Sequence, residues 1–271
     1  MDDRKLPFTI HLSDLRIRLR NALLALLVAC GVAFYFAETL FQLLARPLAR
    51  AWHLAGLPNE LTLKFASLTE PFWVYFELSI YAGVFIASPV IFHQLWKFIA
   101  PGLYDKEKRI AIPFATCSAL MFIGGGLFCY YFVLPAAFKF FLSYSTANIA
   151  KMGEAMGNAA AAAPIAAIAP ELFMLQYMDL GIKMLLGFGV VFELPLAIFF
   201  LSYVGIVTHR GLWKWNKYWV ILSFVIGGVL TPGPDVISQL LMATPLVVLY
   251  NLSIVIAWVV TRRRESETVP A

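Results

Sequence analysis

The sequence predicts an all-α integral membrane protein with six transmembrane helices. Of its 271 residues, 61% are hydrophobic and only 14% are charged. A soluble fold of this length could not keep so much apolar surface from water. The apolar segments are far longer than barrel strands and do not alternate, so we expect helices. Residues 1–20 are charged and lack an apolar region before a cleavage site, so we expect the first span to anchor the chain uncleaved.

Uninterrupted apolar runs place the six spans in a single transmembrane domain that comprises residues 1–271. A cytoplasmic N-terminal segment (1–20) precedes them and a basic tail (261–271) follows them. We expect Pro245 to kink the last span. The runs cover about 21–44, 72–96, 110–138, 173–203, 218–230 and 236–260.

The fifth run is too short to cross a bilayer comfortably. Its 13 residues, Tyr218 to Leu230, form about 20 Å of helix against a hydrocarbon core of about 30 Å. Either the basic and aromatic residues before it extend to the interface, or the bilayer thins locally.

Basic residues predict that both termini are cytoplasmic. Five lie on the side opposite the N-terminus: Arg46, Arg50, Lys64, Lys139 and Lys151. Fifteen lie on the side of the N-terminus: Arg4, Lys5, Arg16, Arg18, Arg20, Lys97, Lys106, Lys108, Arg109, Arg210, Lys214, Lys217, Arg262, Arg263 and Arg264. The net charge of +5 then indicates topology and contact with anionic lipid, not nucleic-acid binding.

The two long outer loops differ in kind. Residues 41–70 contain the motif Arg46-Pro47-Leu48 and an amphipathic stretch, which predicts a helix along the outer interface. Residues 146–170 are rich in alanine and form a connector without a predicted site. No internal repeat is evident, which counts against a transporter built from duplicated halves.

A charged loop with a proline, Trp96 to Arg109, separates the second and third runs. If its second half begins a helix, Asp105 has basic residues at i+3 and i+4 that neutralise it. Glu107 has none at these offsets. An unpaired carboxylate at a basic membrane face is suited to bidentate contact with a guanidinium group from outside the protein. The alternative is a solvated acid favoured by a helix N-terminus.

Asp14 lies in a charged segment just before the first span, and Arg18 at i+4 can pair with it. The segment is either a further part of a docking surface or a charged collar in the headgroup region.

Glu193 lies near the middle of the fourth run. An ionised carboxylate there costs at least a few kcal/mol, so it must be protonated, paired or facing a wet cavity. Lys183 is ten residues, or about 15 Å, away along a helix. Asp179, at i−4, is the expected partner of Lys183. Glu193 is therefore either functional or a protonated hydrogen-bonding group between helices.

The turn from Thr231 to Asp235 contains helix-breaking prolines and a glycine, and Asp235 can cap the next helix. Gln239 then enters the membrane, where its side chain needs a partner helix. The histidines show no metal-ligand spacing, and the sequence contains no phosphate-binding loop or nucleophile elbow. The sequence therefore predicts neither an enzyme nor a cofactor.

With these motifs in their order, the chain resembles the TatC family, the multi-spanning core subunit of the twin-arginine (Sec-independent) protein translocase. The motifs are His11-Leu-Ser-Asp-Leu-Arg-Ile-Arg-Leu19, Arg46-Pro47-Leu48, Phe98-Ile-Ala-Pro-Gly-Leu-Tyr104 with Glu107, Phe192-Glu193-Leu-Pro195 and Leu230-Thr-Pro-Gly-Pro-Asp-Val-Ile-Ser-Gln239. Asp14 departs from the glutamate usual in the family, and Pro-Gly-Pro departs from its two adjacent prolines.

The resemblance implies a cup of six helices with short fifth and sixth helices, in the cytoplasmic (inner) membrane of a prokaryote. It implies that twin-arginine signal peptides bind at Phe98 and Glu107, beside Asp14, Arg16 and Arg18. Glu193 corresponds to the acid that faces the cup. Pro47, Pro101 and Asp235 belong to structural motifs. Thr231 and Gln239 would meet single-span subunits of the TatA and TatB type, and further copies of the chain are also expected partners.

The sequence thus predicts a receptor and organiser for the export of folded proteins, driven by the proton-motive force. The alternative is a small-solute or proton-coupled carrier that titrates Glu193, with Lys183 as its counter-charge. The docking loop and the lack of duplicated halves favour the translocase.

Overall fold

The fold was obtained as a computed structural model, which describes residues 8–55, 61–99, 111–143, 171–230 and 236–267. Within these ranges all regular secondary structure is helical, apart from one isolated bridge between Lys64 and Phe173, so the all-α prediction is confirmed. The elements are α1 (Phe8–Tyr35), α2 (Ala37–Leu54), α3 (Glu70–Ile99), α5 (Ala111–Phe128), η2 (Cys129–Val133), α6 (Leu134–Leu142), α8 (Met174–Phe192), α9 (Leu194–Val204), α10 (His209–Leu230) and α11 (Val236–Glu267).

Five segments of the described chain are long and apolar enough to cross a membrane. They are Leu12–Tyr35, Glu70–Ile99, Ile112–Leu142, Met174–Val204 and Gln239–Arg262. Helix α10 is not among them, because its first half is basic and only its second half is the short apolar run noted in the sequence.

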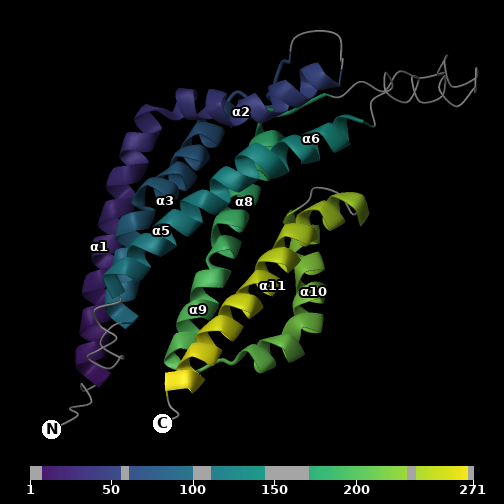
Figure 1. Ribbon diagram of the computed structural model, residues 1–271. Helices are drawn as coiled ribbons and strands as arrows, with labels where there is room; N and C mark the ends of the chain where they lie inside the picture. The colour runs from purple at the N-terminus through teal and green to yellow at the C-terminus, as the bar shows by residue number, and fades with distance from the viewer. Residues whose placement is uncertain (1–7, 56–60, 100–110, 144–170, 231–235, 268–271) are drawn as a thin grey trace, which may run out of the picture.

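The helices form an antiparallel array (Figure 1). Helices α1 and α3 lie side by side, and α2 and α6 extend across one end of the array. The first turn of α1 and the last turn of α11 lie at the other end. Helices α10 and α11 form a hairpin that packs mainly on α9. The main buried core joins α2, α3, η2, α6 and α8, with fully buried Leu48, Val74, Leu134, Met178 and Phe188 at its centre.

Two helix ends differ from the sequence prediction. The first apolar run contains a bend at Phe36, so α1 ends at Tyr35 and α2 begins at Ala37. Helix α2 is amphipathic and buries Leu44, Leu48 and Trp52, so the chain turns there to lay this face on the bundle. The expectation of a short sixth helix was wrong. Helix α11 has 32 residues, because the basic stretch after its apolar part continues the helix.

Pro47 leaves one backbone carbonyl of α2 without its helical hydrogen bond, and tyrosine hydroxyls bond the carbonyls at this place. Proline lacks a backbone N–H, so the carbonyl of Leu43, four residues earlier, has no helical partner. The Tyr130 hydroxyl donates a hydrogen bond to this carbonyl at 2.7 Å. The buried Tyr177 hydroxyl donates to the next carbonyl, that of Leu44. The motif Arg46-Pro47-Leu48 thereby ties α2 to η2 and α8.

The carboxylate of Glu70 joins the segments that precede α3 and α8. It accepts hydrogen bonds from the Ala66 N–H at 2.7 Å and from the Leu175 N–H, in the first turn of α8, at 3.0 Å. Beside it, Lys64 pairs with Glu171 at 2.6 Å, and the Lys64 ammonium group lowers the pKa of the Glu171 carboxyl. Glu70 is 8% exposed, whereas the Lys64–Glu171 pair is open to solvent. Glu70 therefore contributes more to the connection.

Removing the Tyr130 hydroxyl tests the role of Pro47. In the native background, Tyr130→Phe leaves the Leu43 carbonyl unpaired, and we expect a loss of about 1–3 kcal/mol in stability. In the Pro47→Ala background the restored N–H can bond that carbonyl, so we expect Tyr130→Phe to cost much less. Thermal unfolding of the four proteins in one detergent measures both costs.

The exposed neighbour Tyr131 supplies the control, because Tyr131→Phe removes a hydroxyl from the same turn. We expect it to leave the unfolding temperature nearly unchanged. Equal costs of Tyr130→Phe in the two backgrounds would show that the hydroxyl does not compensate for the proline.

Candidate functional site

The charged N-terminal segment begins α1, at the end of the bundle where α3 also ends (Figure 1). The Arg18 Nε donates to the Asp14 Oδ2 at 2.7 Å, which confirms the pairing predicted from their spacing. The Asp14 and Arg18 side chains are 32% and 19% exposed. Arg16 is exposed. The Asp14 carboxylate is therefore engaged within its own helix.

The predicted docking loop is described only where α3 leads into it. Phe98 lies in the last turn of α3 and is half-buried. Glu107 and Pro101 lie outside the described residues, as do Thr231 and Asp235. The structure thus leaves the expected contact between Glu107 and a guanidinium group untested.

An aromatic cluster fills the space next to this loop. Trp96, two residues before Phe98, is 7% exposed. Its ring centroid lies 4.9 Å from that of Phe114 on α5 and 4.8 Å from that of Phe200 on α9. Phe114 also contacts Phe199 at 5.6 Å. The aromatic cluster thereby fixes the end of α3 against α5 and α9.

Glu193 lies at a break within the fourth apolar segment, between α8 and α9. The break follows from Pro195, which has no N–H and disfavours helical geometry at the preceding residue. The Glu193 N–H bonds the Val190 carbonyl at 3.1 Å, and its own carbonyl accepts from Ala197 at 2.8 Å. The break thus keeps its backbone hydrogen-bonded while it redirects the side chain.

The Glu193 side chain points toward α5. Ser118 and Phe122 of α5 lie within electrostatic reach of its carboxyl group. Its Oε1 atom is buried and has no hydrogen-bond partner within the part of the chain that the structure describes. Buried polar atoms are nearly always paired. The carboxyl group therefore lies beside Ser118 and is still able to hydrogen-bond an arriving group.

Ser118 connects this carboxyl group to the aromatic cluster. It is 1% exposed, and its Oγ accepts a hydrogen bond from the Trp96 Nε1 at 2.9 Å. A hydroxyl that accepts from the indole N–H still has its own hydrogen to donate. Trp96, Ser118 and Glu193 therefore form a continuous polar path from the end of α3 to the intramembrane acid.

Sequence reasoning gave no role to Trp96 or Ser118. Ser118 carried a usable signal, because a lone hydroxyl in an apolar run needs a partner on another helix. Trp96 carried none beyond its place beside the charged loop. Among the described residues, no group of three or more His, Cys, Asp or Glu side chains is placed to hold a metal ion.

The Gln239 side chain finds its partner helix within the chain. Its Nε2 donates to the Phe224 carbonyl on α10 at 2.8 Å. The helices approach closely there, because a Cβ on Gly228 would lie 3.2 Å from that Nε2 atom and one on Gly227 would lie 3.0 Å from the Gln239 carbonyl oxygen. Gln239 therefore holds α11 against α10.

Lys183 does not serve as a counter-charge for Glu193. Its Nζ lies 2.7 Å from the Asp179 Oδ2, which confirms the pairing predicted from their spacing. The carrier alternative, which requires Lys183 to balance Glu193, thus loses its structural support.

Comparison with known proteins places this arrangement in a family. The model of the family "Sec-independent protein translocase protein (TatC)" matches residues 10–245. The TatC protein of Aquifex aeolicus is 36% identical over 260 residues, which are 96% of this chain and 98% of that protein. The TatC protein of Desulforapulum autotrophicum is 36% identical over 266 residues, which are 98% of this chain and 89% of that protein.

The fold agrees with the sequence likeness. A crystal structure of a twin-arginine translocase receptor, TatC, aligns with a TM-score of 0.76 at 36% identity and covers 93% of this chain and 100% of that one. A further crystal structure of a twin-arginine translocase receptor, TatC, in DDM aligns with a TM-score of 0.75. This chain therefore belongs to the TatC family of Sec-independent protein translocase proteins.

Proposed function

We propose that this protein is the signal-peptide receptor and core subunit of a translocase that exports folded proteins with twin-arginine signal peptides. The observation that carries the proposal is the likeness, over nearly the whole chain, to a twin-arginine translocase receptor of known structure. The protein acts as a receptor and organiser, not as an enzyme. It contains no recognised nucleotide-binding motif, so the proton-motive force drives transport.

The proposed topology has six spans in one transmembrane domain of the cytoplasmic membrane, with both termini in the cytoplasm. Helix α10 is the additional, shorter span, with its basic first half at the interface. The arrangement supports this topology, because α1 begins and α11 ends at the same end of the bundle. Basic residues follow the same division: Arg16, Lys97 and Arg210 lie at that end, and fewer lie at the end with α2 and α6.

Signal peptides dock, in this proposal, where α1 begins and the loop after α3 lies. Glu107 receives the guanidinium groups and Phe98 packs on the apolar part of the peptide. Because the Asp14 carboxylate is already held by Arg18, these two residues and Arg16 shape the surface while Glu107 makes the decisive contact.

Single-span subunits of the TatA and TatB type assemble, in this proposal, along the hairpin of α10 and α11, together with further copies of the chain and membrane lipid. Thr231 and Gln239 are the proposed contacts to these subunits, and Gln239 also holds α11 against α10. Glu193, with one carboxyl oxygen unpaired in the described residues, meets the inserting signal peptide or a partner helix.

Replacement of Glu107 tests the docking role. Glu107→Gln removes the charge but keeps the shape, and a charge-assisted hydrogen bond contributes about 1.5–3 kcal/mol. We therefore expect signal-peptide binding at least tenfold weaker and loss of signal-peptide crosslinks to the docking loop, with normal membrane insertion. Photo-crosslinking of a twin-arginine precursor in membrane vesicles measures this effect.

Asp105→Asn is the matched control, because basic residues at i+3 and i+4 are expected to neutralise Asp105. We expect it to bind and export precursors normally. Unchanged export by Glu107→Gln, or an equal defect in both variants, would rule out the specific contact.

Substitutions of Glu193 and Ser118 test the later step. We expect Glu193→Ala to impair translocation and deep signal-peptide insertion more than docking. Ser118→Ala removes the hydroxyl that faces this carboxyl group, so we expect the same type of defect, but a smaller one. Ser118→Thr keeps the hydroxyl and should restore most of the activity. Export in vesicles, compared with crosslinking at the docking loop, separates the two steps.

The indole N–H gives a further control. Trp96→Phe keeps an aromatic ring in the cluster but removes the donor to Ser118, so its defect should resemble that of Ser118→Ala. Wild-type transport by Glu193→Ala would reduce Glu193 to a packing residue and end this interpretation.

A further inference from the structure

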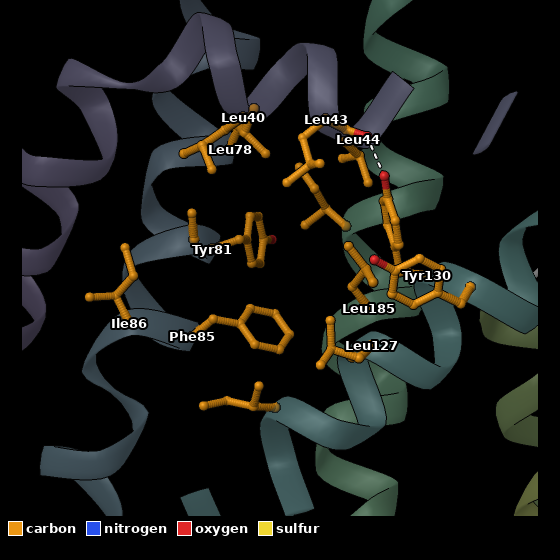
Figure 2. Close-up of a pocket in the computed structure, with 15 residues that line it drawn as sticks. Leu40, Leu43, Leu44, Leu78, Tyr81, Phe85, Ile86, Leu127, Tyr130 and Leu185 are labelled. Carbon is orange, nitrogen blue, oxygen red and sulfur yellow. Dashed lines mark hydrogen bonds between the residues drawn. The ribbon is translucent and has the colours of Figure 1, made fainter. Parts of the chain in front are cut away.

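A cavity of about 350 Å³ opens among α2, α3, α5 and α8. Figure 2 shows Leu40 and Leu44 of α2 above it, with Tyr81 and Phe85 of α3 pointing inward. Leu127 and Leu185 close the opposite side. Its other walls are also made almost entirely of carbon, and three of its four helices belong to apolar membrane-crossing segments. The cavity therefore faces hydrocarbon, not aqueous solvent.

The size and lining restrict what can occupy it. An apolar cavity does not hold ordered water, because water there lacks the two to four polar partners that it needs. An α-helix is a rigid cylinder about 10 Å across, whereas this space lies between the side chains beneath α2. A flexible hydrocarbon chain is thinner and can follow an irregular cavity. An acyl chain fits these limits.

Positive charge lies at the level of α2. Leu43, Arg46 and Arg50 share one face of α2, at i, i+3 and i+7. Leu43 lines the cavity, and both arginines are exposed. Both also interact electrostatically with the hydroxyl of Tyr130, another cavity residue. An anion at this position would lie between the arginines and the top of the cavity.

The other charged groups nearby are occupied by partners within the chain. Tyr81 lies within electrostatic reach of Glu77, and Lys183 pairs with Asp179. All four side chains lie within electrostatic reach of one another on α3 and α8. This polar group carries two acids and one base, so it does not attract an anion. Among the described residues near the cavity, the two arginines of α2 are therefore the positively charged groups that can attract an anion.

We propose that this cavity binds one acyl chain of an anionic phospholipid, whose phosphate contacts Arg46 and Arg50. The lipid comes from the leaflet against which α2 lies. Its chain descends from the level of the arginines past Tyr81 and Phe85, and it fills the space between α3 and α5. The bound lipid completes the packing beneath α2.

Lipid retention tests the proposal. The full-length protein is reconstituted in nanodiscs of phosphatidylglycerol and phosphatidylcholine, and released complexes are analysed by native mass spectrometry. We expect preferential retention of one phosphatidylglycerol. Arg46→Gln with Arg50→Gln should lower its apparent affinity roughly ten- to thirtyfold, since each arginine near an anionic surface contributes about fivefold. Ala82→Phe, which fills the cavity, should abolish retention.

Three comparisons control the experiment. Arg210→Gln with Lys214→Gln removes two exposed cations at the opposite end of the bundle and should retain lipid normally; an equal loss would show a bulk charge effect and overturn the proposal. A free fatty acid retained as well as phosphatidylglycerol would also overturn it. If Ala82→Phe does not fold, Leu127→Phe fills the cavity from another helix and decides the result.

A photoreactive residue at position 82 identifies the occupant directly. A phospholipid adduct supports the proposal. An adduct with the signal peptide of a precursor, or no adduct, contradicts it.

Discussion

The structure depends on the requirement that every backbone polar group shielded from water find a partner within the protein. An unpaired carbonyl there costs about 1–3 kcal/mol, so each helix-breaking residue demands a compensating donor. Pro47 frees the Leu43 carbonyl, and Tyr130 from a different helix bonds it. Tertiary contacts of α2 thus follow from a single missing N–H group. The missing hydrogen bond that weakens α2 as a helix is therefore also the reason why α2 is attached firmly to the bundle.

The break at Glu193 follows the same rule but leaves a group for function. Pro195 ends α8, and the backbone around Glu193 is nevertheless hydrogen-bonded on both sides. The side chain lies beside Ser118 and Phe122, and its Oε1 has no partner among the described residues. A fully bonded backbone with an incompletely bonded acid supports the proposed role of Glu193. A helix that arrives in the membrane can supply the missing hydrogen bond.

Relations within one helix could be read from the sequence, and relations between helices could not. The ion pairs Asp14–Arg18 and Asp179–Lys183 follow from a spacing of four residues, and both are present. The path from Trp96 through Ser118 to Glu193 joins positions that only the packing of α3, α5 and α8 brings together. The bend at Phe36 was missed because the apolar run continues through it without interruption. The length of α11 was missed because its basic end was taken for a tail.

Glu70 gives the molecule a mechanical property. Its one carboxylate bonds the backbone on either side of a sequence gap of more than a hundred residues. The starts of α3 and α8 are therefore held together by this one side chain. Among the described residues, no comparable side-chain hydrogen bond joins the hairpin of α10 and α11 to α3, and the hairpin meets the remaining bundle chiefly through α9. A force on α3 or α8 displaces both helices together. Relative sliding is therefore concentrated at the interface between the hairpin and its neighbours.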